Sequence, residues 1–186
     1  VDLSALYLDV LKDRLYTSRA ASANRRSGQS AMFIILSAMT RLLAPVLTFT
    51  SEEVWQALPG WSKKEESVHL AQFPEMDKNC FDEELGRRWS AMIEAKGEIA
   101  KAIEQARREK VIGHSLDARI TIAAPENLRN LLATHLDELR ALLIVSQLAV
   151  AEDKDIDGSY KSEEIKGLAV GVEKARGTKC ERCWIF

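Results

Sequence analysis

The spacing of apolar side chains predicts helices over the first 110 residues of the chain. Apolar residues recur at helical intervals in four segments, with charged or polar residues between them. The predicted helices cover residues 3–15, about 30–43, 50 or 51 to 58, and about 81–110. Residues 17–29, between the first two, are rich in Ser, Ala, Asn and Arg and predict a loop or a frayed helix end.

Helix-breaking and capping residues give the expected ends of these helices. Pro45 is expected to end the second helix, because proline disfavours helical backbone in the residue before it. Thr50 and Glu53 have capping-box spacing at the start of the third helix, with Ser51 as the alternative cap. Asn79 is the expected cap of the long fourth helix, a rod of about 45 Å. Rods of this length usually complete an antiparallel bundle.

Beyond Gly113 the pattern changes to alternation of apolar and polar residues, which predicts strands. The predicted strands are residues 117–123, 148–151 and 168–172. Pro125 is expected to begin a helix after the first strand, and residues 152–158 to form an acidic turn. The fold predicted is therefore mainly α: an antiparallel helical bundle over residues 1–116, a small α/β domain over 117–176, and a cysteine-containing tail over 177–186.

Composition describes an ordinary globular chain. Of its 186 residues, 46% are hydrophobic and 29% charged, and its longest strongly apolar run is too short to span a membrane. The first residues, beginning at Val1, resemble neither a signal nor a transit peptide, so the chain is expected to be a fragment cut at a chosen boundary. Three cysteines are too few and too uneven for a disulfide framework, which favours a reducing compartment.

Basic charge is concentrated near the first predicted helix. The net charge is −2, but residues 12–26 contain five basic residues and one acidic residue. The helix dipole favours cations at a helix end and can explain Arg14 and Arg19, but it does not explain Arg25 and Arg26. Arginine suits phosphate, and Tyr16 offers a stacking surface for an unpaired base, although a solvated helix face would have the same charge pattern.

Cys180 and Cys183 have the spacing of one zinc knuckle. Structural zinc needs four ligands, so a second pair would be required, and a redox pair is the alternative. Trp184 follows directly and could stack on a base or pack the knuckle against the protein.

Catalytic chemistry is not predicted for this chain. His69, His114 and His135 lack partners at the spacing of a metal site or a triad, and phosphate-loop and nucleophile-elbow motifs are absent. Glu52 and Glu53 are adjacent on a helix and do not face each other, which excludes a paired acid–base role.

Several stretches together, in order, resemble one family, the bacterial isoleucyl-tRNA synthetases. Residues 2–16, Arg25-Arg26-Ser27 and residues 41–55 are similar to its anticodon-binding helical domain. Residues 67–74 and 108–118 are similar to the links before and after its long helix, and residues 180–184 to the first half of its terminal zinc module. Thr48 departs from the family, which usually has a second proline there.

This resemblance implies a role for the chain and for its candidate residues. The parent would be an ATP-dependent class I isoleucine–tRNA ligase whose catalytic domain, which uses ATP and Mg, lies outside the chain. The implied tRNA-binding residues are Arg14, Tyr16, Arg19, Arg25, Arg26, Lys110, Arg182 and Trp184. The implied partner is tRNA(Ile), and the protein is expected to be a cytoplasmic monomer without a membrane partner.

The resemblance also implies that Cys180 and Cys183 bind zinc in the parent protein. With two further cysteines missing, the pair is expected to be metal-free or loosely bound, and the tail from about residue 178 poorly ordered. Two other functions remain open: the equivalent module of a valyl-, leucyl- or methionyl-tRNA synthetase, and a non-enzymatic helical scaffold with a zinc knuckle.

Overall fold

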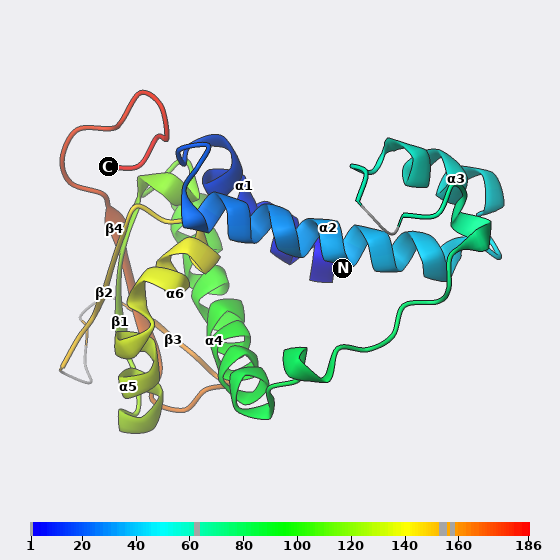
Figure 1. Cartoon of the computed structure of the whole chain (residues 1–186). Coiled ribbons are helices and arrows are strands. Elements are labelled where there is room, and N and C mark those ends of the chain that lie inside the picture. The colour runs from blue at the N-terminus through cyan, green and yellow to red at the C-terminus, as the bar shows by residue number, and fades with distance from the viewer. Residues whose placement is uncertain (1, 62–63, 153–155, 157–158) are drawn as a thin grey trace. The chain divides into compact units, whose positions relative to one another are not determined.

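The computed structural model describes residues 2–61, 64–152, 156 and 159–186. The chain folds into two compact units (Figure 1). The helical unit is Leu11–Phe81, and the sheet unit combines Val1–Val10 with Asp82–Phe186. The mainly α fold with a small α/β part is thus confirmed, but the units do not follow the expected boundary at residue 116.

Six helical segments precede the long helix in the described part of the chain. They are the π-helical turn Asp2–Tyr7, α1 (Leu8–Tyr16), α2 (Ala23–Leu43), α3 (Thr48–Ala57) and the short 3-10 turns Val68–Leu70 and Lys78–Cys80. The helix α2 begins seven residues earlier than predicted, so the loop expected over residues 17–29 is wrong beyond Ser22. The Ser22 hydroxyl accepts a hydrogen bond from the Arg25 amide at 3.3 Å and caps the helix.

The predicted start of α3 is also wrong. This helix begins at Thr48, and its N-cap is Leu47, whose side chain makes no capping bond. Thr50 and Ser51 lie inside the helix, and Ser51 is buried there. The capping-box spacing was coincidental, because the chain enters α3 directly from the turn after α2.

Trp55 is the centre of the core of the helical unit. It is 2% exposed and packs with the buried residues Ala44, Leu58 and Val68. Its indole N–H donates to the Glu65 carbonyl at 2.9 Å, which satisfies the one polar atom of a buried ring.

Glu52 joins α3 to the segment after it. Its carboxylate accepts hydrogen bonds from the Ser67 hydroxyl at 2.8 Å and the Val68 amide at 3.0 Å. Hydrogen bonds from Gln56 and then Ser67 hold the pKa of Glu52 below its ordinary value. Glu52 therefore stabilises local structure, in agreement with rejecting it as half of an acid–base pair.

The sheet unit contains a four-stranded mixed sheet and three α-helices. Its strands are β1 (Ala118–Ala123), β2 (Gln147–Val150), β3 (Tyr160–Lys161) and β4 (Ala169–Lys174), in the order β2-β1-β4-β3. Its helices are α4 (Glu83–Arg108), α5 (Glu126–Thr134) and α6 (Leu136–Leu143), with a 3-10 turn at Ser115–Asp117. The strand β1 is parallel to β2 and antiparallel to β4, and β4 is antiparallel to β3.

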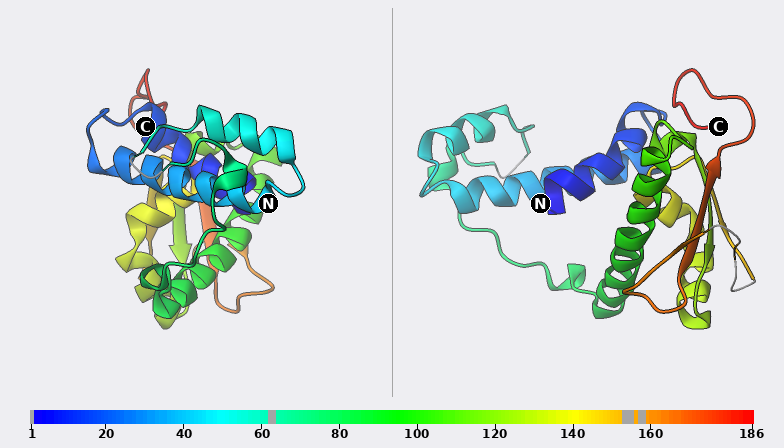
Figure 2. Two further views of the ribbon diagram at one scale, coloured as in Figure 1. Left: turned by 45° about the vertical axis from the view of Figure 1, so that its right-hand side comes forward. Right: turned by 180° about the vertical axis from the view of Figure 1, so that it is seen from behind.

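The three helices share one hydrophobic core with the sheet (Figure 2). Ile120 and Ile122 of β1 are completely buried, whereas Arg119 and Thr121, which alternate with them, are half-buried. The helix α4 buries an alanine- and isoleucine-rich stripe, including Ile99, in the same core. This packing explains why α4 belongs to the sheet unit rather than to a bundle with the preceding helices.

Smaller differences between prediction and structure concern a helix cap, a short strand and a turn. The cap of α4 is Asp82, whose carboxylate accepts from the Leu85 amide at 2.9 Å, so the expected cap Asn79 is wrong. The strand β3 has two residues and was missed, because its length is below any detectable alternation. Residues 153–155, 157 and 158 of the expected acidic turn lie outside the described residues.

Replacing Gly97 by alanine will stabilise the sheet unit. Gly97 lies in the interior of α4, and a Cβ added there would meet nothing within 4 Å. Alanine should raise the free energy of unfolding by about 0.5–1 kcal/mol, because glycine loses more backbone entropy in a helix. Urea unfolding measures this, with Gly28→Ala as control, since a Cβ at Gly28 would lie 3.3 Å from Leu11 Cδ2. A Gly97→Ala variant no more stable than Gly28→Ala would contradict the prediction.

Candidate nucleic-acid interface

The α1–α2 turn, residues 14–26, contains five of the eight expected RNA-binding residues. Hydrogen bonds inside the turn hold its backbone. The Thr17 hydroxyl donates to the Asp13 carboxylate at 2.8 Å, and the Ser22 amide donates to the Arg19 carbonyl at 3.0 Å. Arg25 reaches back through Nη1 to the Ser18 carbonyl at 3.5 Å. The turn therefore presents its side chains from an ordered backbone.

The four arginines of this turn are not neutralised locally. Among the described residues, none of them forms an ion pair with a carboxylate. Arg19 and Arg26 are exposed, whereas Arg14 and Arg25 are half-buried. Tyr16 is 76% exposed at the end of α1. The turn thus combines uncompensated positive charge with a free aromatic ring.

Arg25 and Arg26 lie at the start of α2, where cations lower the stability of a helix. They occupy the first turns of α2, which has no acidic residue in its first turn. The positive end of the helix dipole repels cations and attracts anions. Two arginines placed there add to the dipole field instead of offsetting it, an arrangement suited to a bound phosphate.

The other three candidates lie in the sheet unit. Lys110 follows the end of α4, and Arg182 and Trp184 belong to the knuckle, residues 180–185. The Trp184 amide donates to the Cys180 carbonyl at 2.9 Å, and the Cys180 amide donates to the Ile185 carbonyl at 2.9 Å. These two bonds close the knuckle into a tight turn.

Trp184 is held in an exposed position. It is 60% exposed, and its φ of 62° is in the left-handed region, which is rare for a large side chain. Lys179 Nζ lies 5.8 Å from the centre of its ring, and the Phe186 amide donates to the buried Ser146 hydroxyl at 3.0 Å. Phe186 and Lys179 therefore anchor the knuckle, and the ring of Trp184 stays available for stacking. Sequence reasoning missed Lys179, although it directly precedes the motif.

Cys180 has the environment of a metal-binding thiolate. Hydrogen bonds from the Cys183 and Arg182 amides lower the pKa of its thiol below the ordinary value. Cys183 supplies a second thiol within the same turn, but the described residues contain no group of three or more potential metal ligands. The pair therefore fits half of a tetrahedral zinc site.

Comparison with known proteins identifies the family. Residues 1–122 match the family described as "Anticodon-binding domain of tRNA ligase". The whole chain is 48% identical to the isoleucine–tRNA ligase of Syntrophotalea carbinolica over 187 residues and 46% identical to that of Geobacter sulfurreducens. It is 43% identical to that of Natranaerobius thermophilus over 191 residues. In each case the match covers 100% of this chain and 20% of the relative.

The length of the match limits what these relatives establish. The chain spans about a fifth of the curated relatives it matches, because the match covers 20% of each. In the described part of the chain, no helix is long and apolar enough to cross a membrane. The family match itself covers most of the chain and includes the α1–α2 turn. The chain therefore belongs to the family of anticodon-binding domains of tRNA ligases.

Proposed function

We propose that this chain is the tRNA-binding module of an isoleucine–tRNA ligase, and that it holds the anticodon stem-loop of tRNA(Ile). Aminoacylation would take place in an ATP- and Mg-dependent catalytic domain outside these residues. The single observation that best supports this function is that the four arginines of the α1–α2 turn form no ion pair among the described residues, in a chain that matches an anticodon-binding domain.

The α1–α2 turn would bind the RNA through phosphate contacts and stacking. Arg19 and Arg26 are exposed and would contact phosphates, which gives affinity without base specificity. Arg25 and Arg14 would strengthen the local positive field. Tyr16 would stack on a base that has turned out of the loop, as proteins commonly do with single-stranded RNA.

The knuckle would make a second RNA contact through Trp184 and Arg182. The ring of Trp184 is exposed and supported by Lys179, which favours stacking on a base. Cys180 and Cys183 would hold zinc as two of four thiolate ligands, with the other two supplied by residues outside this chain. Zinc would fix the knuckle and so the direction of Trp184.

Lys110 would be a weaker phosphate contact at the end of α4. The module is expected to act as a monomer in the cytoplasm.

Binding of an isolated anticodon stem-loop tests the proposed function. The chain should bind a fluorescent stem-loop of tRNA(Ile), and the logarithm of the affinity should fall linearly as the logarithm of the salt concentration rises. Stem-loops of tRNA(Val), tRNA(Leu) and tRNA(Met) should bind less tightly. Tighter binding of one of these would favour the equivalent module of that other ligase. Failure to bind any stem-loop at low salt would favour a protein scaffold instead.

A further inference from the structure

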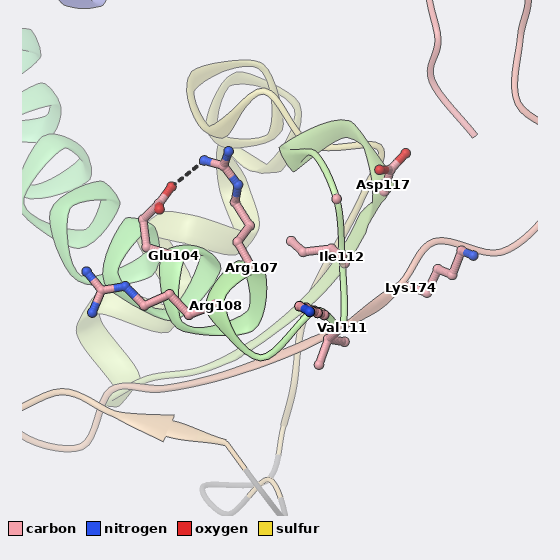
Figure 3. A pocket seen from close by; sticks show the side chains of 9 residues that line it. Glu104, Arg107, Arg108, Val111, Ile112, Asp117 and Lys174 are labelled. Carbon is pink, nitrogen blue, oxygen red and sulfur yellow. Dashed lines mark hydrogen bonds and ion pairs between the residues drawn. The ribbon is translucent and has the colours of Figure 1, made fainter.

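A pocket in the sheet unit lies beyond the end of α4, and none of its lining residues belongs to the α1–α2 turn or to the knuckle. Its volume is about 550 Å³, and its lining residues are Glu104, Arg107, Arg108, Lys110–Gly113, Asp117 and Lys174 (Figure 3). Four of the lining side chains are basic and two are acidic. We call it the α4-end pocket.

Both acidic residues of the α4-end pocket are already occupied. Glu104 pairs with Arg107 at 2.7 Å. Asp117 accepts a hydrogen bond from the His114 amide at 2.9 Å and pairs with Lys179 at 3.3 Å. The pocket therefore keeps an uncompensated positive charge.

Three cations remain: Arg108, Lys110 and Lys174. In the described residues none of them has an ion pair. Figure 3 shows Arg108 at the end of α4 and Lys174 on the opposite side of the lining residues, with the two side chains directed away from each other. Lys174 belongs to β4, so a helix end and a strand end supply cations to one hollow.

Lys110 has a strained backbone conformation at this site. The Val111 amide donates to the Ala106 carbonyl at 2.9 Å, and the Lys110 amide donates to the Arg107 carbonyl at 3.1 Å. These two bonds form a Schellman motif, in which the residue at the position of Lys110 is usually glycine. Its φ is 60°, so a lysine is kept where glycine would be more stable. Such strain is typical of functional sites.

The helix dipole explains only part of this cluster. Cations near the end of a helix interact favourably with its carbonyls, which explains Arg107 and Arg108. It does not explain Lys174, which comes from another element, or a lysine in place of glycine at residue 110. Successive phosphates of a polyanion explain both, because an extended backbone can reach unpaired cations on both sides of the pocket.

We propose that the α4-end pocket binds phosphodiester groups of the RNA backbone. The inference rests on the proposed function and extends its Lys110 contact to a site that includes Arg108 and Lys174. Arg108 offers a planar fork for two phosphate oxygens, while Lys110 and Lys174 act as single charges.

Lys110→Gly separates the role of the charge from the role of the fold. Glycine preserves the Schellman motif and relieves the strain, so the variant should melt about 2 °C higher. Its affinity for the tRNA(Ile) stem-loop should fall roughly threefold to tenfold, and the salt slope by about one. Higher stability with unchanged RNA affinity would overturn the proposal, and a lower melting temperature would remove the strain argument that supports it.

A double variant tests the remaining cations. Arg108→Ala with Lys174→Ala should reduce the salt slope by about two. The control, Lys161→Ala with Lys166→Ala, removes two exposed cations outside the pocket and should leave the slope unchanged. Equal slopes in the two double variants would overturn the phosphate site.

The outcomes distinguish this proposal from the proposed function. If wild type binds the stem-loop while the pocket variants bind equally well, the pocket proposal fails and the proposed function stands. If wild type binds no stem-loop, both fail. Inorganic phosphate, added at constant ionic strength, tests whether the pocket prefers a small anion to the stem-loop. If it binds in the pocket and the stem-loop does not displace it, the pocket is a site for small anions and the RNA assignment is overturned.

Discussion

Replacing Arg25 and Arg26 together by glutamate will weaken binding of the tRNA(Ile) anticodon stem-loop by roughly 100-fold or more at low salt. Two favourable phosphate interactions become two repulsive ones at an ordered helix start. The fold should not suffer, because acidic residues are favoured in the first turn of a helix. A variant at least as stable as wild type that no longer binds RNA would separate binding from folding. Fluorescence anisotropy and thermal melting measure the two properties.

A matched control is available on α4. Arg87 and Arg88 are also adjacent arginines near a helix start, and Arg87→Glu with Arg88→Glu makes the same change in net charge. This control should weaken binding only slightly, through the overall charge. If both double variants lose affinity equally, the α1–α2 turn has no special role and the chain binds RNA only through non-specific attraction to its surface cations.

Replacing Glu98 by alanine will lower the free energy of unfolding of the sheet unit by about 2–4 kcal/mol. Glu98 is a charged residue of α4 and only 2% exposed. Its carboxylate accepts hydrogen bonds from the Tyr160 and Ser162 hydroxyls and pairs with Lys101. It thus joins α4 to the β3 segment, and alanine would leave three polar groups without their shared partner.

Urea unfolding, followed by a probe in the sheet unit, measures this loss. Glu94→Ala is the control, because Glu94 is one turn earlier on the same helix and exposed, and it should change the free energy of unfolding by less than about 0.5 kcal/mol. Equal effects of the two substitutions would mean that the buried carboxylate contributes nothing specific.

The same carboxylate makes the stability of the sheet unit depend on pH. Hydrogen bonds from Lys101 and then Ser162 hold the pKa of Glu98 below its ordinary value of 4.5. The folded state therefore favours the ionised form, so the contribution is complete above 4.5 and is lost as pH falls through the lower folded pKa. The stability difference between wild type and Glu98→Gln should accordingly shrink in acid.

The long helix and the strands were predictable from the sequence because their patterns are long or regular. The apolar stripe of α4 extends over several turns, and its predicted span of about 81–110 contains the observed Glu83–Arg108. Alternation in β1 predicted which of its residues are buried, because Ile120 and Ile122 face the core. A regular spacing of apolar residues places them on one face of a helix or strand, and that face packs into the core.

The start of α2 could not be predicted, because it depends on contacts outside the local pattern. Ser, Ala, Asn and Arg suggested a loop or a frayed helix end before residue 30. Ser22 acts as the cap instead, and Gly28 lets α2 pack closely against Leu11 of α1. A residue that weakens an isolated helix is placed here where a Cβ would lie 3.3 Å from Leu11 Cδ2, a tight contact between two helices.

The candidate site was predictable in its residue types but not in its surroundings. Arginines near a tyrosine suggested RNA contact, yet sequence could not exclude that nearby carboxylates neutralise them. Nor could it show that Arg108 and Lys174, 66 positions apart, line one pocket. Lys110 and Trp184 gave no sign of their left-handed backbone, because that conformation depends on the hydrogen bonds of a helix end and a knuckle.

The most direct test of whether the cationic α1–α2 turn binds RNA is chemical-shift mapping. Amide shifts are followed during titration with the tRNA(Ile) stem-loop. The amides of residues 14–26 are expected to shift early and strongly, with those of Arg25 and Arg26 among the largest changes. Shifts confined to other surfaces, with residues 14–26 unchanged at saturation, would contradict that role.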